Sequence, residues 1–415
     1  MTTLMSALND ALAARYPTVA VSPNARFLPM LDLSKGELSS TAAIEIARAL
    51  RGDARTIAAQ LVSDISQKIP GDWKVIAGYI VLSLVPVEIL KEEVLAYEAP
   101  RVRHPEHEPG RSIVCLVPDS TSPVYARLRL IACGALQALL AVAYEGECRV
   151  ACEPDQPRVV RSSGEIVDIV ARAVERCLRS EGEARLHYEV PTNLLSTTKP
   201  LTVWTSHHYH DRLPRSVKDA FTQARNAGTG VLKIPADGWL LCRDRALSET
   251  LSASSLKKVI DRLSSQEAWL RWVYHFASSI PSGDLDPSVA LYDECASPRW
   301  TLQVLHQRVS QLVLPHVQGE GASLVSQVVS APLQERDLLL RSLFIRPLTA
   351  RAIQEGEVLA WSAVIEEFAS RAHALLNSPA FRRSLTEAPS TPWLMQINAG
   401  LVLGVTGILP AVSSR

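Results

Sequence analysis

Residues 112–144 read SIVCLVPDSTSPVYARLRLIACGALQALLAVAY and are the most informative segment for the fold class. It opens with a short apolar run, residues 112–117, which favours a strand. A loop with prolines at both ends follows at 118–123, and a strongly apolar segment at 125–144 has the length of a helix. A strand, a loop and a helix in this order form the first half of a βαβ unit. The stretch therefore predicts a parallel sheet with helices packed against it.

The next hundred residues continue this alternation. Strand candidates lie at 147–152 and 201–205, helix candidates lie at 164–179 and 214–227, and residues 230–241 suggest two short extended pieces. Strands that alternate with helices are typical of a doubly wound parallel sheet. We therefore predict that residues 112–283 form a truncated Rossmann-like domain.

The two flanking sections have different patterns. Residues 1–16 and 55–65 have apolar residues at helical spacing, as do residues 38–50, while residues 75–84 alternate as strands do. Asp53, after Gly52, is a candidate N-cap. Residues 1–99 are thus predicted to be a small α+β domain. Residues 284–415 contain no convincing strand, and helices expected near 298–313, 333–343, 350–376 and 393–405 predict an all-α bundle. The fold class is α/β multidomain.

Composition excludes several classes of protein. The chain has 43 basic and 43 acidic residues and 47% hydrophobic residues, which excludes a disordered polyelectrolyte and argues against a salt-driven, histone-like nucleic-acid binder. A local basic patch remains possible. The seven cysteines are widely spaced, so we expect free thiols in a reducing cytoplasm and no metal site. The apolar segments are too short for a membrane span, and no membrane association is expected.

The residues alone define no active site. The loop at 118–123 contains no glycine, so a P-loop is absent, and its Ser120 and Ser122 could either donate hydrogen bonds to a phosphate or cap the following helix. His207, His208 and His210 follow a predicted strand end, where ligands of open α/β sheets bind. Their pattern fits a catalytic or metal-binding loop and also a solvated one.

Blocks at both ends of the chain resemble arginyl-tRNA synthetases, which are class I enzymes. GELSSTAAIEIARAL at 36–50, RTIA at 55–58 and VIAGYI at 75–80 are similar to the additional N-terminal domain of that family, which contacts the elbow of tRNA. Residues 339–343 and 359–377 and the closing GVTGILP at 404–410 resemble its DALR-type anticodon-binding bundle. Residues 201–225 and 235–258 resemble, more weakly, the second half of its catalytic domain.

The resemblance fails at the catalytic signatures of the family. Where the family has His-x-Gly-His, this chain reads PVYAR at 123–127, and Tyr125 would occupy space that adenine requires. Where the family has a mobile lysine, this chain reads CRDR at 242–245. The resemblance therefore implies that no residue is catalytic, that no cofactor is used, and that the chain is a pseudoenzyme. The residues that would remain of a degenerate nucleotide site are Ser120, Ser122, Tyr125, Arg127, Arg243 and Arg245.

The resemblance also implies a function. The chain would bind tRNA, with tRNA-Arg as the expected species, and would hold it for a partner enzyme as a cytoplasmic adaptor. One alternative is a protein-interaction subunit that has lost RNA binding, and another is a divergent arginine-tRNA ligase that uses ATP. A solvated helix face is the alternative reading of every candidate RNA contact. These contacts are Arg48, Arg51, Arg55, Arg371, His373, Asn377, Arg382 and Arg383.

Overall fold

The computed structural model describes residues 2–19, 27–30, 32, 34–86, 88–90, 111–115, 124–152, 158–179, 201–204, 232–233, 257–258, 260–277 and 333–379. The chain divides into two compact units. Unit 1 comprises residues 1–102, 309–344 and 371–400, and unit 2 comprises residues 103–308, 345–370 and 401–415. The domain bounds predicted from the sequence, 1–99, 112–283 and 284–415, stay predictions.

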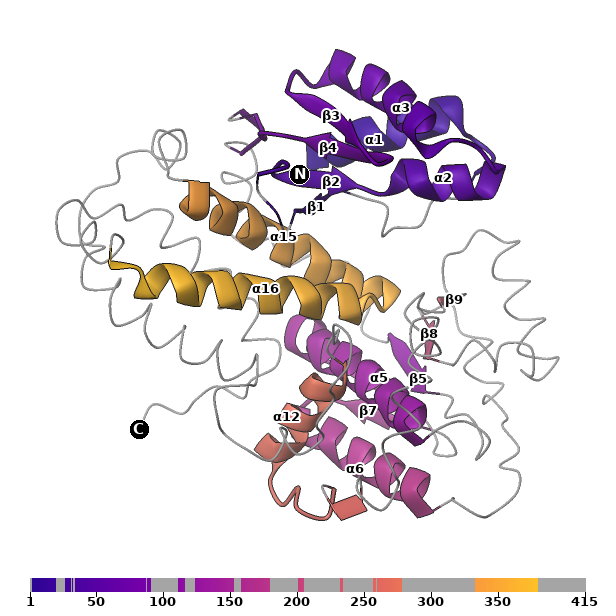
Figure 1. The fold of residues 1–415 in the computed structure, drawn as a ribbon. Coiled ribbons are helices and arrows are strands. Elements are labelled where there is room, and N and C mark those ends of the chain that lie inside the picture. Colours follow the sequence, from indigo (N-terminus) through magenta and orange to yellow (C-terminus); the bar gives the residue numbers. More distant parts are fainter. Residues whose placement is uncertain are drawn as a thin grey trace. The chain divides into compact units, whose positions relative to one another are not determined.

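Unit 1 contains a four-stranded antiparallel sheet in the order β1-β2-β4-β3. Its strands are β1 (Leu28–Pro29), β2 (Leu38–Ser40), β3 (Trp73–Ile76) and β4 (Tyr79–Leu82). Helices α2 (Ala42–Leu50) and α3 (Ala54–Lys68) pack against the sheet, and α1 (Thr2–Arg15) packs on α3 (Figure 1). The first helix and the two strands predicted at 75–84 are confirmed.

The start of α3 follows from the local sequence, whereas the start of α2 depends on pairing with a distant strand. Asp53 accepts hydrogen bonds from the backbone N–H groups of Arg55 and Thr56, so the predicted N-cap is confirmed. The helix predicted at 38–50 is wrong at its start, because residues 38–40 form strand β2. There Leu38 pairs with Leu82 and is fully buried, so the sheet satisfies its backbone and removes its side chain from water.

Unit 2 contains a five-stranded sheet in the order β7-β6-β5-β8-β9. Strand β5 (Ser112–Cys115) pairs in parallel with both β6 (Cys148–Cys152) and β8 (Leu201–Trp204), and β8 pairs in parallel with β9 (Leu232–Lys233). The edge strand β7 (Arg158–Val160) is antiparallel to β6. The parallel pairing that the sequence predicts is therefore present in these pairs, whereas the doubly wound arrangement stays a prediction.

Three helices of unit 2 pack together. Helix α5 (Val124–Glu145) contacts α6 (Ser163–Arg179), α12 (Gln266–Ala277) and strands β5, β6 and β8. Its segment Arg127–Glu145 is long and apolar enough to cross a membrane, but 78% of an 18-residue stretch within it is buried inside the protein. Since α5 lies between a sheet and two helices, its apolar composition is that of a core helix.

Helix α12 was not predicted from the sequence, although its start has a recognisable signal. The hydroxyl oxygen of Ser265 accepts a hydrogen bond from the backbone N–H of Ala268, 3.1 Å away, as an N-cap serine does. The aromatic residues of the following QEAWLRWVYHFA are spaced so that Trp272 and Phe276 stack, with ring centroids 4.6 Å apart.

The helices predicted at 333–343 and 350–376 have the wrong boundary between them. Helix α15 runs from Leu333 to Glu355 and includes Pro347, and α16 runs from Val358 to Asn377. The break falls at Gly356, whose φ of 75° is the left-handed conformation that ends many helices. The helices predicted at 214–227, 298–313 and 393–405 lie outside the described residues, as does most of 230–241.

Candidate functional site

The carboxyl edge of the five-stranded sheet is where an open α/β sheet places a ligand. The chain leaves β5 for β6 on one side and later returns to β8 on the other, so the strand order reverses at β5. The last residues of these strands, Cys115, Cys152 and Trp204, lie in register with one another. All three are buried, with at most 2% of their surface exposed.

Helix α5 lies directly against this edge because residue 134 has no side chain. A Cβ atom built on Gly134 would be 2.2 Å from the Sγ atom of Cys115 and 3.3 Å from Cδ1 of Trp204. Real Cβ atoms do not approach other heavy atoms this closely, so glycine is required for this contact. The space between helix and strand is therefore filled by the thiol and the indole.

A buried glutamine satisfies the polar groups around Trp204. The indole Nε1–H of Trp204 donates to Oε1 of Gln137 at 2.7 Å. The amide nitrogen of Gln137 donates to Oγ1 of Thr202 at 3.1 Å and to the carbonyl oxygen of Ile353 at 2.8 Å. Gln137, on α5, is fully buried. Its side chain therefore replaces water as the hydrogen-bond partner of two side chains on β8 and of one backbone carbonyl on α15. The network holds β8 and α5 in one relative position.

Thiols gather on the same face of the sheet. The hydrogen bond of the Cys115 thiol with Cys152, together with burial and the nearby Cys133, raises the pKa of Cys115 well above its usual value. Burial and the neighbouring Glu145 raise the pKa of Cys148 to about 12. These thiols are protonated at neutral pH and are poor nucleophiles in this state. The five cysteines in the described part of the chain are free, in agreement with the sequence prediction.

The residues predicted to remain of a nucleotide site are only partly described. Ser120, Ser122, Arg243 and Arg245 lie outside the described residues. Tyr125 lies in the first turn of α5. Arg127, one turn into α5, is only 2% exposed. Its guanidinium is therefore part of the protein interior.

The three arginines predicted as RNA contacts on unit 1 are all exposed. Arg51 ends α2 in the left-handed conformation, with φ 54°, and only Gly52 separates it from the cap of α3. This short turn keeps Arg48, Arg51 and Arg55 within one segment of eight residues. In the described part of the chain, no ion pair involves the side chain of Arg48 or Arg51, while the carboxylate of Asp53 is bonded to Thr56.

A tyrosine that sequence reasoning missed lies next to this turn. The β3–β4 hairpin contacts the start of α3, since a Cβ atom on Gly78 would be 2.8 Å from Cβ of Ala54. Tyr79 follows Gly78 and is 40% exposed. Successive residues of a strand point to opposite faces, so the exposed Tyr79 points away from the face of its buried neighbour Ile80. An apolar strand containing one tyrosine beside a Gly turn is the signal that could have indicated it.

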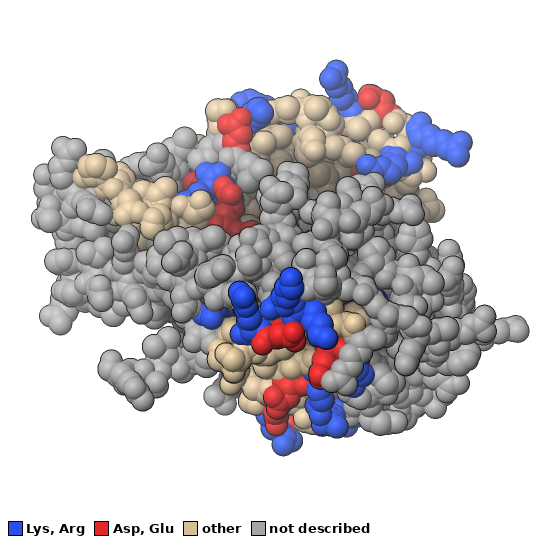
Figure 2. All heavy atoms as spheres, turned by 60° about the horizontal axis from the view of Figure 1, so that its bottom comes forward, with Lys and Arg blue, Asp and Glu red and all other residues tan. Residues whose placement is uncertain are grey.

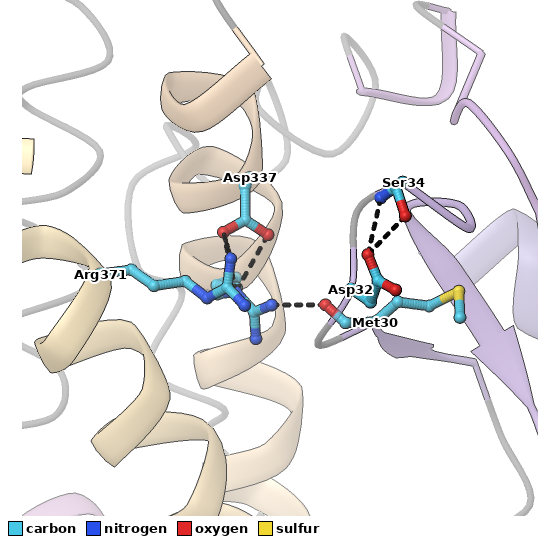
Figure 3. A network of polar contacts seen from close by, with 6 residues as sticks. Met30, Asp32, Ser34, Asp337 and Arg371 are labelled. Carbon is cyan, nitrogen blue, oxygen red and sulfur yellow. Dashed lines mark hydrogen bonds and ion pairs between the residues drawn. The ribbon is translucent and has the colours of Figure 1, made fainter.

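Among the candidate RNA contacts on α16, Arg371 has a structural role in the protein. Nη1 of Arg371 donates to Oδ2 of Asp337 at 2.9 Å, and the same carboxylate accepts from Nε of Arg341 at 3.0 Å (Figure 3). Arg341 also donates to the carbonyl oxygen of Met30 at 2.6 Å. His373 is half-buried and Asn377 is exposed, whereas Arg382 and Arg383 lie outside the described residues.

A second buried ion pair lies in the same unit. Arg336 pairs with Glu37, and both side chains are at most 7% exposed. Arg336 also donates to the carbonyl oxygen of Val85, whose N–H donates to Glu37. Glu37 precedes β2 and Arg336 lies on α15, so this network joins the N-terminal sheet to helix α15 within unit 1. Removing either partner would leave a buried charge.

The described surface of unit 2 is not uniformly basic on the face that Figure 2 shows. Figure 2 shows Lys and Arg side chains intermixed with Asp and Glu side chains on its described part. Arg161 pairs with Glu147 at 2.8 Å, and Nε of Arg172 donates to the carbonyl oxygen of Asp168. Among the described residues, no group of three or more His, Cys, Asp or Glu side chains could hold a metal ion.

No family model matches the sequence, and no curated protein matches it. Two solved structures are similar over nearly the whole chain. Arginyl-tRNA synthetase from Thermus thermophilus is 13% identical with a TM-score of 0.49, covering 98% of both chains. Arginyl-tRNA synthetase from Plasmodium falciparum is 10% identical with a TM-score of 0.48, covering 99% of this chain and 98% of that one. At these values neither similarity carries an argument about family or function.

Proposed function

We propose that this chain is a non-catalytic, arginyl-tRNA synthetase-like protein that binds tRNA through unit 1, with tRNA-Arg as the expected species. The observation that carries the proposal is the exposed segment around Arg48, Arg51 and Arg55, with the exposed ring of Tyr79 on the adjoining hairpin. Guanidinium groups bind phosphates, and an aromatic ring stacks on an unpaired base. A short basic turn therefore suits the phosphates of a folded RNA loop, and an exposed aromatic side chain in the same domain suits an unpaired base.

The absence of adenylate chemistry rests on the carboxyl edge of the sheet. Arg127 is buried, and Cys115 and Trp204 fill the space beneath α5. A buried guanidinium cannot follow a phosphate through a reaction without leaving the protein interior. These features support a chain without adenylate chemistry, and we propose that it acts as a cytoplasmic adaptor that holds tRNA for a partner enzyme.

Binding of tRNA-Arg to the full chain, measured by filter retention over a range of salt concentrations, tests the proposal. The triple variant R48A/R51A/R55A removes up to three phosphate contacts, so the slope of log affinity against log salt falls by about two to three and affinity at low salt falls at least about tenfold. Tyr79→Ala weakens binding at all salt concentrations without changing the slope.

The matched control is R158A/R161A/R172A, which removes three exposed arginines from unit 2 and leaves RNA binding unchanged. Equal losses in both triple variants would show non-specific attraction and contradict the assignment to unit 1. An absence of tRNA binding with a fixed copurifying protein would select the protein-interaction subunit. Pyrophosphate exchange that depends on arginine and tRNA would show a divergent ligase.

A further inference from the structure

Two cysteines end neighbouring strands at the carboxyl edge of the sheet. Cys115 is the last residue of β5, Cys152 is the last residue of β6, and the two are direct partners in the parallel register. Neighbouring strands lie about 4.8 Å apart, and disulfides join Cα atoms separated by about 4.4–6.8 Å. Side chains of directly paired residues point to the same face of a sheet. The backbone therefore already has the spacing that a disulfide needs.

The two thiols also meet within the protein. Cys115 and Cys152 are both buried, and Cys152 and Cys133 of α5 lie close enough to the thiol of Cys115 to raise its pKa. The backbone of α5 at Gly134 covers the thiol of Cys115. Cys148, on the same strand as Cys152, instead donates its thiol to the carbonyl oxygen of Ala138, 3.8 Å away. Cys115 and Cys152 are thus close to each other, whereas Cys148 has a different partner.

We propose that Cys115 and Cys152 form a reversible dithiol–disulfide pair that a peroxide oxidises. One thiolate attacks a peroxide oxygen, which breaks the O–O bond, releases one water after protonation and leaves a sulfenic acid. The second thiolate attacks that sulfur, the S–S bond forms, and the hydroxyl group leaves as a second water. Two thiols lose two protons and two electrons, and hydrogen peroxide is reduced to two molecules of water.

Burial sets the rate of this reaction. A thiol reacts as its thiolate, both cysteines are buried, and α5 covers the thiol of Cys115, so oxidation requires a local opening of this helix from the sheet. The rate should therefore rise with pH and with low concentrations of urea. The bond would link the carboxyl ends of β5 and β6 across the segment that contains α5, and should make that segment harder to unfold.

The experiment treats the folded full chain with hydrogen peroxide, removes the peroxide, blocks the remaining thiols with N-ethylmaleimide in denaturant, and maps the peptides by mass spectrometry. Cys115 and Cys152 should lose maleimide labelling together, a linked peptide should contain both, and dithiothreitol should restore both thiols. Cys148 serves as the internal control and should stay a thiol until higher peroxide doses. Cys152→Ser should abolish the linked peptide, while Cys148→Ser should leave it unchanged.

Three results would overturn the proposal. One is oxidation of Cys148 at doses that yield no linked peptide. Another is a dominant Cys115–Cys133 link in the wild-type chain. The third is a Cys115–Cys152 link that forms only after full unfolding, judged by circular dichroism of the same samples. Because the wild-type measurement needs no substitution, it remains informative even if a variant fails to fold.

Discussion

Glu366 on α16 should make the stability of unit 2 depend on pH near neutrality. Burial raises the pKa of Glu366 to about 7, and its Oε1 atom has no hydrogen-bond partner. The nearby hydroxyl of Tyr274, on α12, is also buried and without a partner in the described part of the chain, and the carboxyl of Glu366 helps to raise its pKa. Glu366 is therefore favoured as the neutral acid in the folded state.

The direction and size of the effect follow from the shift. The pKa of Glu366 rises from 4.5 in the unfolded chain to about 7 in the folded chain. Its stabilising contribution is fully present below pH 4.5 and is lost as pH rises through 7. A difference of about 2.5 pKa units at about 1.4 kcal/mol each corresponds to roughly 3 kcal/mol, as an upper value. Glu366→Gln removes this titration and nearly preserves the side-chain volume.

Urea unfolding of the wild type and of Glu366→Gln, followed by circular dichroism near pH 5 and near pH 8, measures the effect. The free energy of unfolding of the variant, relative to that of the wild type, should increase from pH 5 to pH 8 by up to roughly 3 kcal/mol. Glu165→Gln provides a control without pH dependence, because the backbone N–H groups of Arg161 and Ser162 lower the pKa of Glu165 and its carboxyl is ionised in both the folded and the unfolded state over this range. A stability difference between wild type and Glu366→Gln that stays constant across this range would refute the reasoning.

Two further predictions concern the contact between α5 and the sheet. Gln137→Leu should destabilise unit 2 by roughly 2–5 kcal/mol in urea unfolding, because it leaves the buried indole N–H of Trp204 and the carbonyl of Ile353 without partners; an unchanged midpoint would show that water replaces the amide. Gly134→Ala should cost roughly 1–3 kcal/mol or more, since its Cβ would lie 2.2 Å from the thiol of Cys115. The double variant with Cys115→Ala should recover part of that loss, and equal stabilities of the single and double variants would contradict the steric explanation.

Local sequence signals predicted the elements that depend on neighbouring residues. Asp53 was identified as the cap of α3 because a carboxylate at this position can accept bonds from N–H groups two and three residues later. The apolar run of α5 was identified by its length and composition. By contrast, the predicted helical segment at 38–50 concealed strand β2, since the partner of Leu38 is Leu82, far along the chain.

For the candidate sites, too, local features could be predicted from the sequence, whereas contacts between distant residues could not. The exposed arginines of the α2–α3 turn could be proposed from sequence, because a turn between two amphipathic helices is at the surface. The role of Arg371 could not, because its partner Asp337 lies 34 positions away on another helix. Likewise, no spacing in the sequence indicates that Cys115 and Cys152 meet, since that depends on the register of two strands.

The approximate positions of most helices and strands, and the cap of α3, could be read from the sequence, because they depend on periodicity and on residues close together in the chain. Only the tertiary structure decided which strands are neighbours, that Arg127 is buried, and that Gly134 is required beneath α5. The two sets of features differ because the interactions behind them act over different distances along the chain. Backbone periodicity and capping act within a few residues, whereas burial, strand register and ion pairs depend on groups that the chain brings together only when it folds.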